Sequence, residues 1–153
     1  MNASAIRAFR FEELAIGQSD SLMRTIMARD VALFADVSGD DNPIHLSDSY
    51  AANTRFGQRI AHGMFTASLV SALLGTRLPG PGAIYLSQTL TFLAPVKIGD
   101  IVMAKVEVVE LVIDKRRARL FCECLVDGKP VLEGEAWIAL PPPHKPKAPA
   151  PRA

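Results

Sequence analysis

An apolar segment in the middle of the chain decides the fold: residues 62–74 read HGMFTASLVSALL. Apolar side chains fall on nearly every side of a helix drawn through this segment, and such a helix has to be enclosed by other structure. Gly75 follows directly and favours a helix end, and the stiff loop LPGPG comes next at 78–82. We therefore expect one central, buried helix over residues 62–74.

The chain downstream of this helix alternates between apolar and polar residues with a period of two. The alternation predicts strands over residues 84–92, 102–109, 118–126 and 131–140, and Asp127-Gly128 predicts a tight turn between the last two. Consecutive long strands after one buried helix indicate an antiparallel sheet curled around that helix. The fold class expected is α+β.

The chain upstream of the helix is more polar and carries shorter elements. We expect a strand near residues 19–27, then a helix that Asp30 caps and Gly39 ends, and a second short helix capped by Ser47. Between these two helices lies a polar loop at 38–45, which reads SGDDNPIH.

Length and composition indicate a single domain. The chain has 153 residues, of which 49% are hydrophobic, and we expect the folded domain to span residues 1–140. The proline-rich remainder, residues 141–153, can neither continue a helix nor join a sheet, which predicts a disordered or polyproline-like tail.

The charge pattern disfavours large anionic partners. Seventeen basic and 16 acidic residues give a net charge of +1, so no field favours nucleic acid or a membrane surface. We find neither a signal peptide pattern nor an apolar run of about 18 residues, and we expect a cytoplasmic protein. Cys122 and Cys124 share one face of a strand, where they fit a core better than a disulfide or a zinc site.

The polar loop contains residues that can perform acid–base chemistry. If the loop brings Asp40 and His45 together, their side chains can hold one water, and one group can take its proton while the other supplies a proton to a neighbouring carbon. Hydration of a conjugated double bond requires this pair of transfers. The same residues are also ordinary turn formers, so a purely structural loop explains their composition equally well.

The start of the central helix offers a complementary feature. The first backbone N–H groups, at Gly63 and Met64, have no partner within the helix, and the helix dipole favours negative charge there. Gly63 has no side chain, so a ligand carbonyl can approach it closely. His62-Gly63 can also be a helix start and nothing more, and Ser71 can be a small residue bonding the carbonyl one turn back.

Three separated motifs then occur in a fixed order. They are FAxxSGDxNPxH at 34–45, TxFGxxIAHGM at 54–64 and LPGPGxIYLxQxLxFxxP at 78–95, with Gly99-Asp100 following. Together they resemble the MaoC-like dehydratases, a family with the hot dog fold that contains (R)-specific enoyl-CoA hydratases. The resemblance covers residues 11–139 and implies a hot dog fold with an antiparallel sheet wrapped around a central helix.

The resemblance also implies roles for individual residues. Asp40 and His45 match the catalytic pair, Gly63 the backbone oxyanion contact, Ser71 a polar residue near the catalytic carboxylate, and Asn42 a support of the loop. We expect the substrate to be bound by His62, Met64, Tyr85 and Leu86. Asp41 departs from the family pattern and competes with Asp40 for the role of the carboxylate, although the spacing to Asn42-Pro43 favours Asp40.

The expected reaction is the reversible syn hydration of trans-2-enoyl thioesters of CoA or an acyl carrier. We expect it to need no cofactor or metal. The family resemblance also implies a homodimer with two sites. An acyl-CoA thioesterase is the hydrolytic alternative, but residues 62–74 contain no Asp or Glu to serve one. A domain that only binds acyl groups is the non-catalytic alternative.

Overall fold

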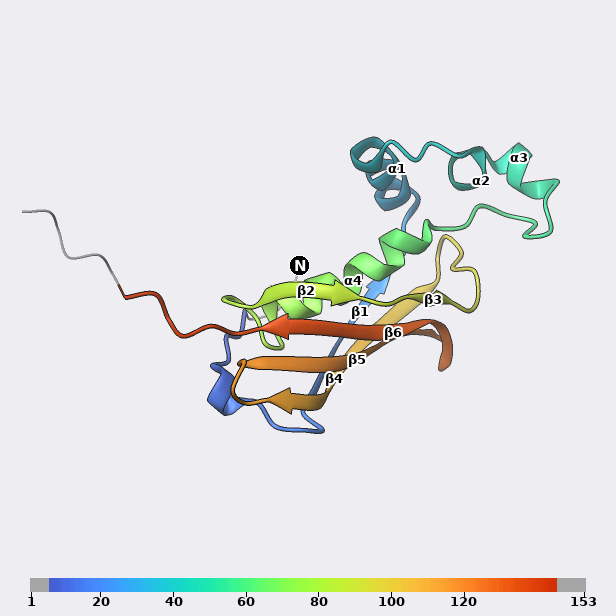
Figure 1. The fold of residues 1–153 in the computed structure, drawn as a ribbon. Coiled ribbons are helices and arrows are strands. Elements are labelled where there is room, and N and C mark those ends of the chain that lie inside the picture. Colours follow the sequence, from blue (N-terminus) through green and yellow to red (C-terminus); the bar gives the residue numbers. More distant parts are fainter. Residues whose placement is uncertain (1–5, 146–153) are drawn as a thin grey trace, which may run out of the picture.

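The computed structural model describes residues 6–145 and shows an antiparallel sheet with a long helix against one face (Figure 1). The strands are β1 (Ser19–Thr25), β2 (Ile84–Gln88), β3 (Thr91–Phe92), β4 (Ile101–Val112), β5 (Arg117–Val126) and β6 (Lys129–Ala139). They are ordered β1-β4-β5-β6-β2, and β3 also pairs with β6. The helices are η1 (Phe11–Glu13), α1 (Ala28–Ser38), α2 (Pro43–Leu46), α3 (Asp48–Ala52) and α4 (Gly63–Thr76). The predicted hot dog fold, with α4 as its central helix, is confirmed.

The core lies between α4 and the inward faces of β4, β5 and β6. In register, Val106 lies opposite Cys122 and Leu120 lies opposite Ala136, and all four are fully buried. Val70 and Leu73 of α4 are equally buried against this face. Cys122 and Cys124 are free, buried thiols, as predicted from their place on one strand face.

The prediction of one continuous half-buried strand over residues 84–92 is wrong. The chain leaves the ladder at Thr89, whose carbonyl lies so close to β6 that a Cβ at Gly134 would be 1.8 Å from the oxygen. Thr89 still donates its N–H to the Glu135 carbonyl of β6 at 2.9 Å, but regular pairing with β6 resumes only at β3. The apolar residues of β2 are also more exposed than predicted, with Ile84 at 50% and Leu86 at 43%.

The central helix is not enclosed on every side as predicted. Met64 is 57% exposed, and Ser71 and Ala72 are exposed on the same open side of α4. The helix also runs through Gly75 to Thr76, so Gly75 does not end it; Arg77 follows the last turn and donates its N–H to the Leu73 carbonyl at 2.9 Å.

The helices α1, α2 and α3 and the loop after them form a projecting segment, residues 28–61, which stands beyond the sheet near the start of α4 (Figure 1). Asp30 is not the N-cap of α1: the helix begins at Ala28, and Asp30 Oδ2 accepts the Met27 N–H at 3.2 Å from within the first turn. Ser47 caps α3 as predicted, since its hydroxyl accepts the Tyr50 N–H at 3.2 Å. The short helices η1 and α2 were not predicted.

The end of the chain is described only in part. Residues 141–145 form neither helix nor strand, and the rest of the predicted tail, from 146, lies outside the described residues. Across residues 6–145, no helix combines the length and apolar character needed to cross a bilayer.

Candidate active site

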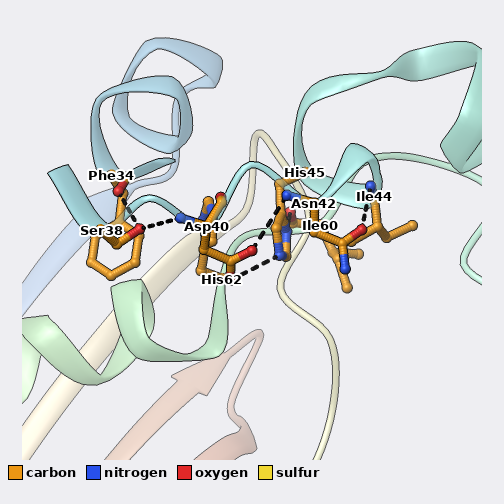
Figure 2. Close-up of polar contacts among 8 residues, drawn as sticks. All are labelled: Phe34, Ser38, Asp40, Asn42, Ile44, His45, Ile60 and His62. Carbon is orange, nitrogen blue, oxygen red and sulfur yellow. Dashed lines mark hydrogen bonds and ion pairs between the residues drawn. The ribbon is translucent and has the colours of Figure 1, made fainter. Parts of the chain in front are cut away.

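The loop that follows α1 is shaped by its own side chains. Gly39 ends the helix in the left-handed region at φ +77°, a conformation that glycine adopts without strain. The Ser38 hydroxyl donates to the Phe34 carbonyl at 2.6 Å and accepts the Asp40 N–H at 3.1 Å. These contacts fix where Asp40 leaves the helix (Figure 2).

Asn42 then starts α2, the short helix that carries His45. Its side-chain oxygen accepts the Ile44 N–H at 3.1 Å, and Pro43 occupies the first helical position, where its missing N–H costs nothing. The Asn42 N–H in turn donates to Asp40 Oδ1 at 3.3 Å. The turn-forming residues of this loop therefore place Asp40 and His45 on either side of one bend.

Asp40 and His45 face each other across this bend. Asp40 Oδ2 lies 4.0 Å from His45 Nε2, and His45 Nδ1 lies 2.8 Å from the Ile60 carbonyl (Figure 2). Because a carbonyl oxygen only accepts, Nδ1 carries the hydrogen in neutral His45, which leaves the lone pair of Nε2 directed towards Asp40. The imidazole is buried, whereas the Asp40 side chain is 54% exposed.

Asp41 does not share this position. Its N–H donates to the Gly39 carbonyl at 3.1 Å, and its side chain is exposed and absent from the cavity wall that Asp40 lines. The geometry therefore favours Asp40 as the carboxylate that faces His45.

His62 lies directly beneath the pair. Its ring stacks on His45 with centroids 3.7 Å apart, and its Nε2 lies 2.9 Å from the Asp40 carbonyl. It was predicted as a substrate-binding residue, and it does line the cavity, but its hydrogen bond and its closest ring contact are with the two residues of the pair.

The start of α4 forms the adjoining wall. Within residues 6–145 the N–H groups of Gly63 and Met64 have no hydrogen-bond partner, as predicted for the first turn of a helix. A Cβ at Gly63 would lie 2.6 Å from the ring of Phe92, so the Phe92 side chain, which is 52% exposed, would have to move to make room for one.

These groups open into one cavity of about 470 Å³. Its lining includes Asp40, His45, His62, Gly63 and Met64, so the structure brings together five of the predicted site residues. Lining residues that were not predicted include Arg55, Thr66, residues 93–96, Val131 and Leu132. The segment 84–92 was expected to form a wall of the substrate pocket, and its last residue, Phe92, does line the cavity. Pro95 belongs to the third motif, but nothing in its spacing connected it with the loop at 38–45.

The remaining predicted residues lie elsewhere. Ser71, Tyr85 and Leu86 line a second hollow between α4 and β2, and only Met64 among the predicted residues borders both spaces. Within this chain, Ser71 is therefore not beside the Asp40 carboxylate. The Tyr85 hydroxyl donates to the Gln88 side chain, and burial raises the pKa of Tyr85 to about 12, so it remains protonated at neutral pH.

A metal fits this arrangement poorly. Asp40, His45 and His62 each place a potential ligand atom within 4.8 Å of the others. However, the two imidazole rings are stacked at an interplanar angle of 27°, so their in-plane lone pairs run side by side and do not converge on one ion. One nitrogen of each ring is also engaged by a backbone carbonyl.

Comparison with known proteins gives consistent matches. The family model described as MaoC like domain matches residues 13–122. A 3-hydroxybutyryl-CoA dehydratase from Methylorubrum extorquens is 57% identical over 89% of this chain and 87% of its own length. An (R)-specific enoyl-CoA hydratase from Rhodospirillum rubrum is 50% identical over 92% of this chain and 98% of its own length.

A solved structure shares the fold as well. The unliganded R-hydratase from Pseudomonas aeruginosa superimposes with a TM-score of 0.86 at 43% identity, covering 97% of both chains. Family model, relatives and structure agree with the motifs at 34–45, 54–64 and 78–95. The chain belongs to the MaoC-like domain family.

Proposed function

We propose that this protein is an (R)-specific enoyl-CoA hydratase and, because the reaction is reversible, a 3-hydroxyacyl-CoA dehydratase. One observation carries the proposal: the Asp40 carboxylate, the Nε2 lone pair of His45 and the free N–H of Gly63 meet in one cavity. The names of the relatives at 50% and 57% identity support the same chemistry.

The geometry of the pair is suited to holding the attacking water. With Asp40 Oδ2 and His45 Nε2 4.0 Å apart, one water oxygen can lie within hydrogen-bonding distance of both atoms. Both atoms are acceptors, so the water donates one hydrogen to each. Its lone pairs then remain free to attack the β-carbon of the enoyl group.

The proton transfers balance within the pair. The water oxygen keeps one hydrogen and bonds to the β-carbon as a hydroxyl group, while the other hydrogen passes as a proton to His45 or Asp40 and from there to the α-carbon. Both additions come from the face on which the pair lies, which makes the hydration syn. The pair ends each turnover as it began, so the reaction uses no cofactor beyond the thioester carrier.

Negative charge develops on the thioester oxygen as water attacks, because the double bond is conjugated with the carbonyl. The free N–H of Gly63 and the positive end of the α4 dipole can stabilise this charge. Protonation of the α-carbon then returns the oxygen to its neutral carbonyl form.

The test uses two neighbouring carboxylates. Purified wild-type protein should hydrate crotonyl-CoA, seen as loss of the enoyl absorbance, and Asp40→Asn should lower kcat roughly 10²-fold or more. Asp41→Asn is the matched control and should retain wild-type activity, because Asp41 lies outside the cavity. Absence of hydration by the wild type, or equal activity of Asp40→Asn, would refute the proposal.

The alternatives find less support. A thioesterase of the kind that carries its carboxylate on the central helix lacks that group here, since α4 contains no Asp or Glu. Release of free CoA, followed with a thiol reagent, would reveal such an activity. A non-catalytic acyl-binding domain predicts instead that acyl-CoA binds without turnover and that His45→Ala changes nothing.

Two further features suggest how the thioester is held. Arg55 is the one Lys or Arg that lines the cavity within residues 6–145, and we assign it to the phosphates of CoA or of an acyl carrier. The hollow with Ser71, Tyr85 and Leu86 shares Met64 with the cavity, and we assign it to the acyl chain. Arg55→Gln should raise KM for crotonyl-CoA several-fold with little change in kcat. Activity measured on a series of enoyl-CoAs should define the acyl chain length that the hollow accepts.

The functional unit that we propose is a homodimer. β2 lies at the edge of the sheet, and its Ile84 and Leu86 are about half exposed beside the open side of α4. An uncovered edge strand with apolar neighbours favours association, here with a second copy. Light scattering should give a dimer, and Leu86→Lys should weaken it. Ile113→Lys, at an apolar residue 70% exposed in the β4–β5 turn, is the control.

We also propose a cytoplasmic location, because the two cysteines of β5 are free thiols of the core, as is usual for proteins of a reducing compartment. Cell fractionation tests this, and recovery in an oxidising compartment would contradict it.

A further inference from the structure

His62 contacts both members of the Asp40–His45 pair although it comes from a different element. It precedes α4, is only 2% exposed, and has Phe34 on its other side with ring centroids 4.9 Å apart. Through its ring it meets the imidazole of His45, and through Nε2 it meets the backbone of Asp40 (Figure 2). A change in the position of His62 would therefore move both reacting groups.

The contact with Asp40 defines the tautomer of His62. The carbonyl oxygen of Asp40 only accepts, so in neutral His62 the hydrogen lies on Nε2 and Nδ1 bears a lone pair. Nδ1 is buried and has no hydrogen-bond partner within residues 6–145. Leaving such an acceptor without a partner is unfavourable, so the structure calls for a donor nearby.

Thr66 supplies a matching donor one helical turn along α4. Its hydroxyl is also buried and also lacks a partner within the described range, and it lines the same cavity. The two unsatisfied atoms are complementary, because Nδ1 can only accept whereas the hydroxyl can donate. No direct bond joins them, but a water that accepts the Thr66 hydrogen and donates to Nδ1 would satisfy both atoms.

We propose that His62 is a positioning residue for Asp40 and His45, and that Thr66 holds its tautomer through one bridging water. The inference rests on the proposed function, because His62 can position reacting groups only if Asp40 and His45 are those groups. His62 fixes the backbone of Asp40 by a hydrogen bond and the plane of the His45 ring by stacking.

The tautomers can be measured without any activity assay. In ¹⁵N-labelled wild-type protein, long-range ¹H–¹⁵N correlation spectra at neutral pH should show His62 protonated on Nε2 alone. Thr66→Val removes the donor but keeps the shape of the side chain, and it should shift the His62 Nδ1 resonance. Thr76→Val is the matched control, because the Thr76 hydroxyl donates to the Ala72 carbonyl at 2.6 Å at the far end of α4. A hydrogen on Nδ1, or no response to Thr66→Val, would overturn the water-bridged arrangement.

Kinetics of two replacements separate the contacts of His62. His62→Phe keeps a ring against His45 but loses the donor to Asp40, whereas His62→Gln keeps a donor and loses the ring. Small displacements of reacting groups cost up to about 10²-fold in rate, so we expect kcat to fall by about 10- to 100-fold in each variant, with KM within about threefold of wild type.

The outcomes separate the positioning role of His62 from the proposed hydratase function. Unchanged kcat in both variants, with an active wild type, would overturn the positioning role and leave the proposed function standing. A wild-type protein without hydratase activity would overturn the proposed function itself. Each variant is compared at a temperature where its circular dichroism matches that of the wild type, so loss of fold does not enter the comparison.

Discussion

The interior of the sheet and the projecting segment hold their residues by different means. In the sheet, side chains such as Leu120 and Val106 are fully buried against neighbours on adjacent strands, and their position follows from packing. In the projecting segment, Asp40 and Asn42 are exposed and are placed by hydrogen bonds to the backbone of their own loop. Packing therefore provides most of the stability, while the hydrogen-bonded loop provides the reacting groups.

This division predicts that the largest effect on activity comes from the projecting segment. His45→Gln removes the Nε2 lone pair that faces Asp40, and kcat for crotonyl-CoA hydration should fall about 10²- to 10⁴-fold. The midpoint of urea denaturation should change little, because the segment adds few fully buried side chains to the core. Activity close to that of the wild type would show that the projecting segment does not provide the reacting groups.

The largest effect on stability should come from the sheet. Leu120→Ala leaves a cavity at a fully buried position of β5, and the free energy of unfolding should fall by about 2–5 kcal/mol. Leu125→Ala, on the same strand but only partly buried, is the control and should cost less. The kcat of the folded Leu120→Ala protein should stay near that of the wild type, and a large loss would show that the two regions are coupled.

The same division explains how far the sequence could predict the molecule. The long strands alternate apolar and polar side chains with a period of two, so their buried faces could be predicted from the pattern, and the apolar run at 62–74 was enough to predict the central helix. The break after β2 could not, because it depends on the close approach of Thr89 to Gly134, 45 residues away on β6. The open side of α4 was missed for the same reason: the segment is apolar all round, and only the arrangement of its neighbours decides which side stays exposed.

The candidate site could be predicted where its residues are close in sequence, but not where they come from distant parts of the chain. Asp40, Asn42 and His45 lie within one loop, and their spacing contains the turn and the helix cap that place them. His62 lies 22 residues from Asp40, and its stacking on His45 requires the chain to return past α3. No local pattern of residues encodes that return.

A smaller effect should follow from loosening the loop without touching a reacting group. Asn42→Ala removes the N-cap of α2, and loss of such a cap costs about 1 kcal/mol. Because α2 carries His45, kcat should fall several-fold, while the urea midpoint should shift only slightly. Asn42→Asp can still accept the Ile44 N–H and should restore most of the activity; failure to do so would mean that Asn42 acts other than as a cap.

The smallest effect on activity is expected from the thiols of the sheet, because neither Cys122 nor Cys124 lines the cavity that holds Asp40 and His45. Burial raises the pKa of Cys122 to about 11 and that of Cys124 to about 12, above the ordinary value of 9.0. At pH 8 both thiols are therefore protonated in the folded protein, and a thiol reagent should react only after unfolding, with no loss of hydratase activity before then. As the pH rises above about 9 the unfolded chain loses these protons first, so these two groups should lower the stability between pH 9 and 12. Rapid labelling of the native protein at pH 8 would show that the interior of the sheet opens more readily than its packing implies. The sheet would then not be the rigid, packed region that we contrast with the projecting segment.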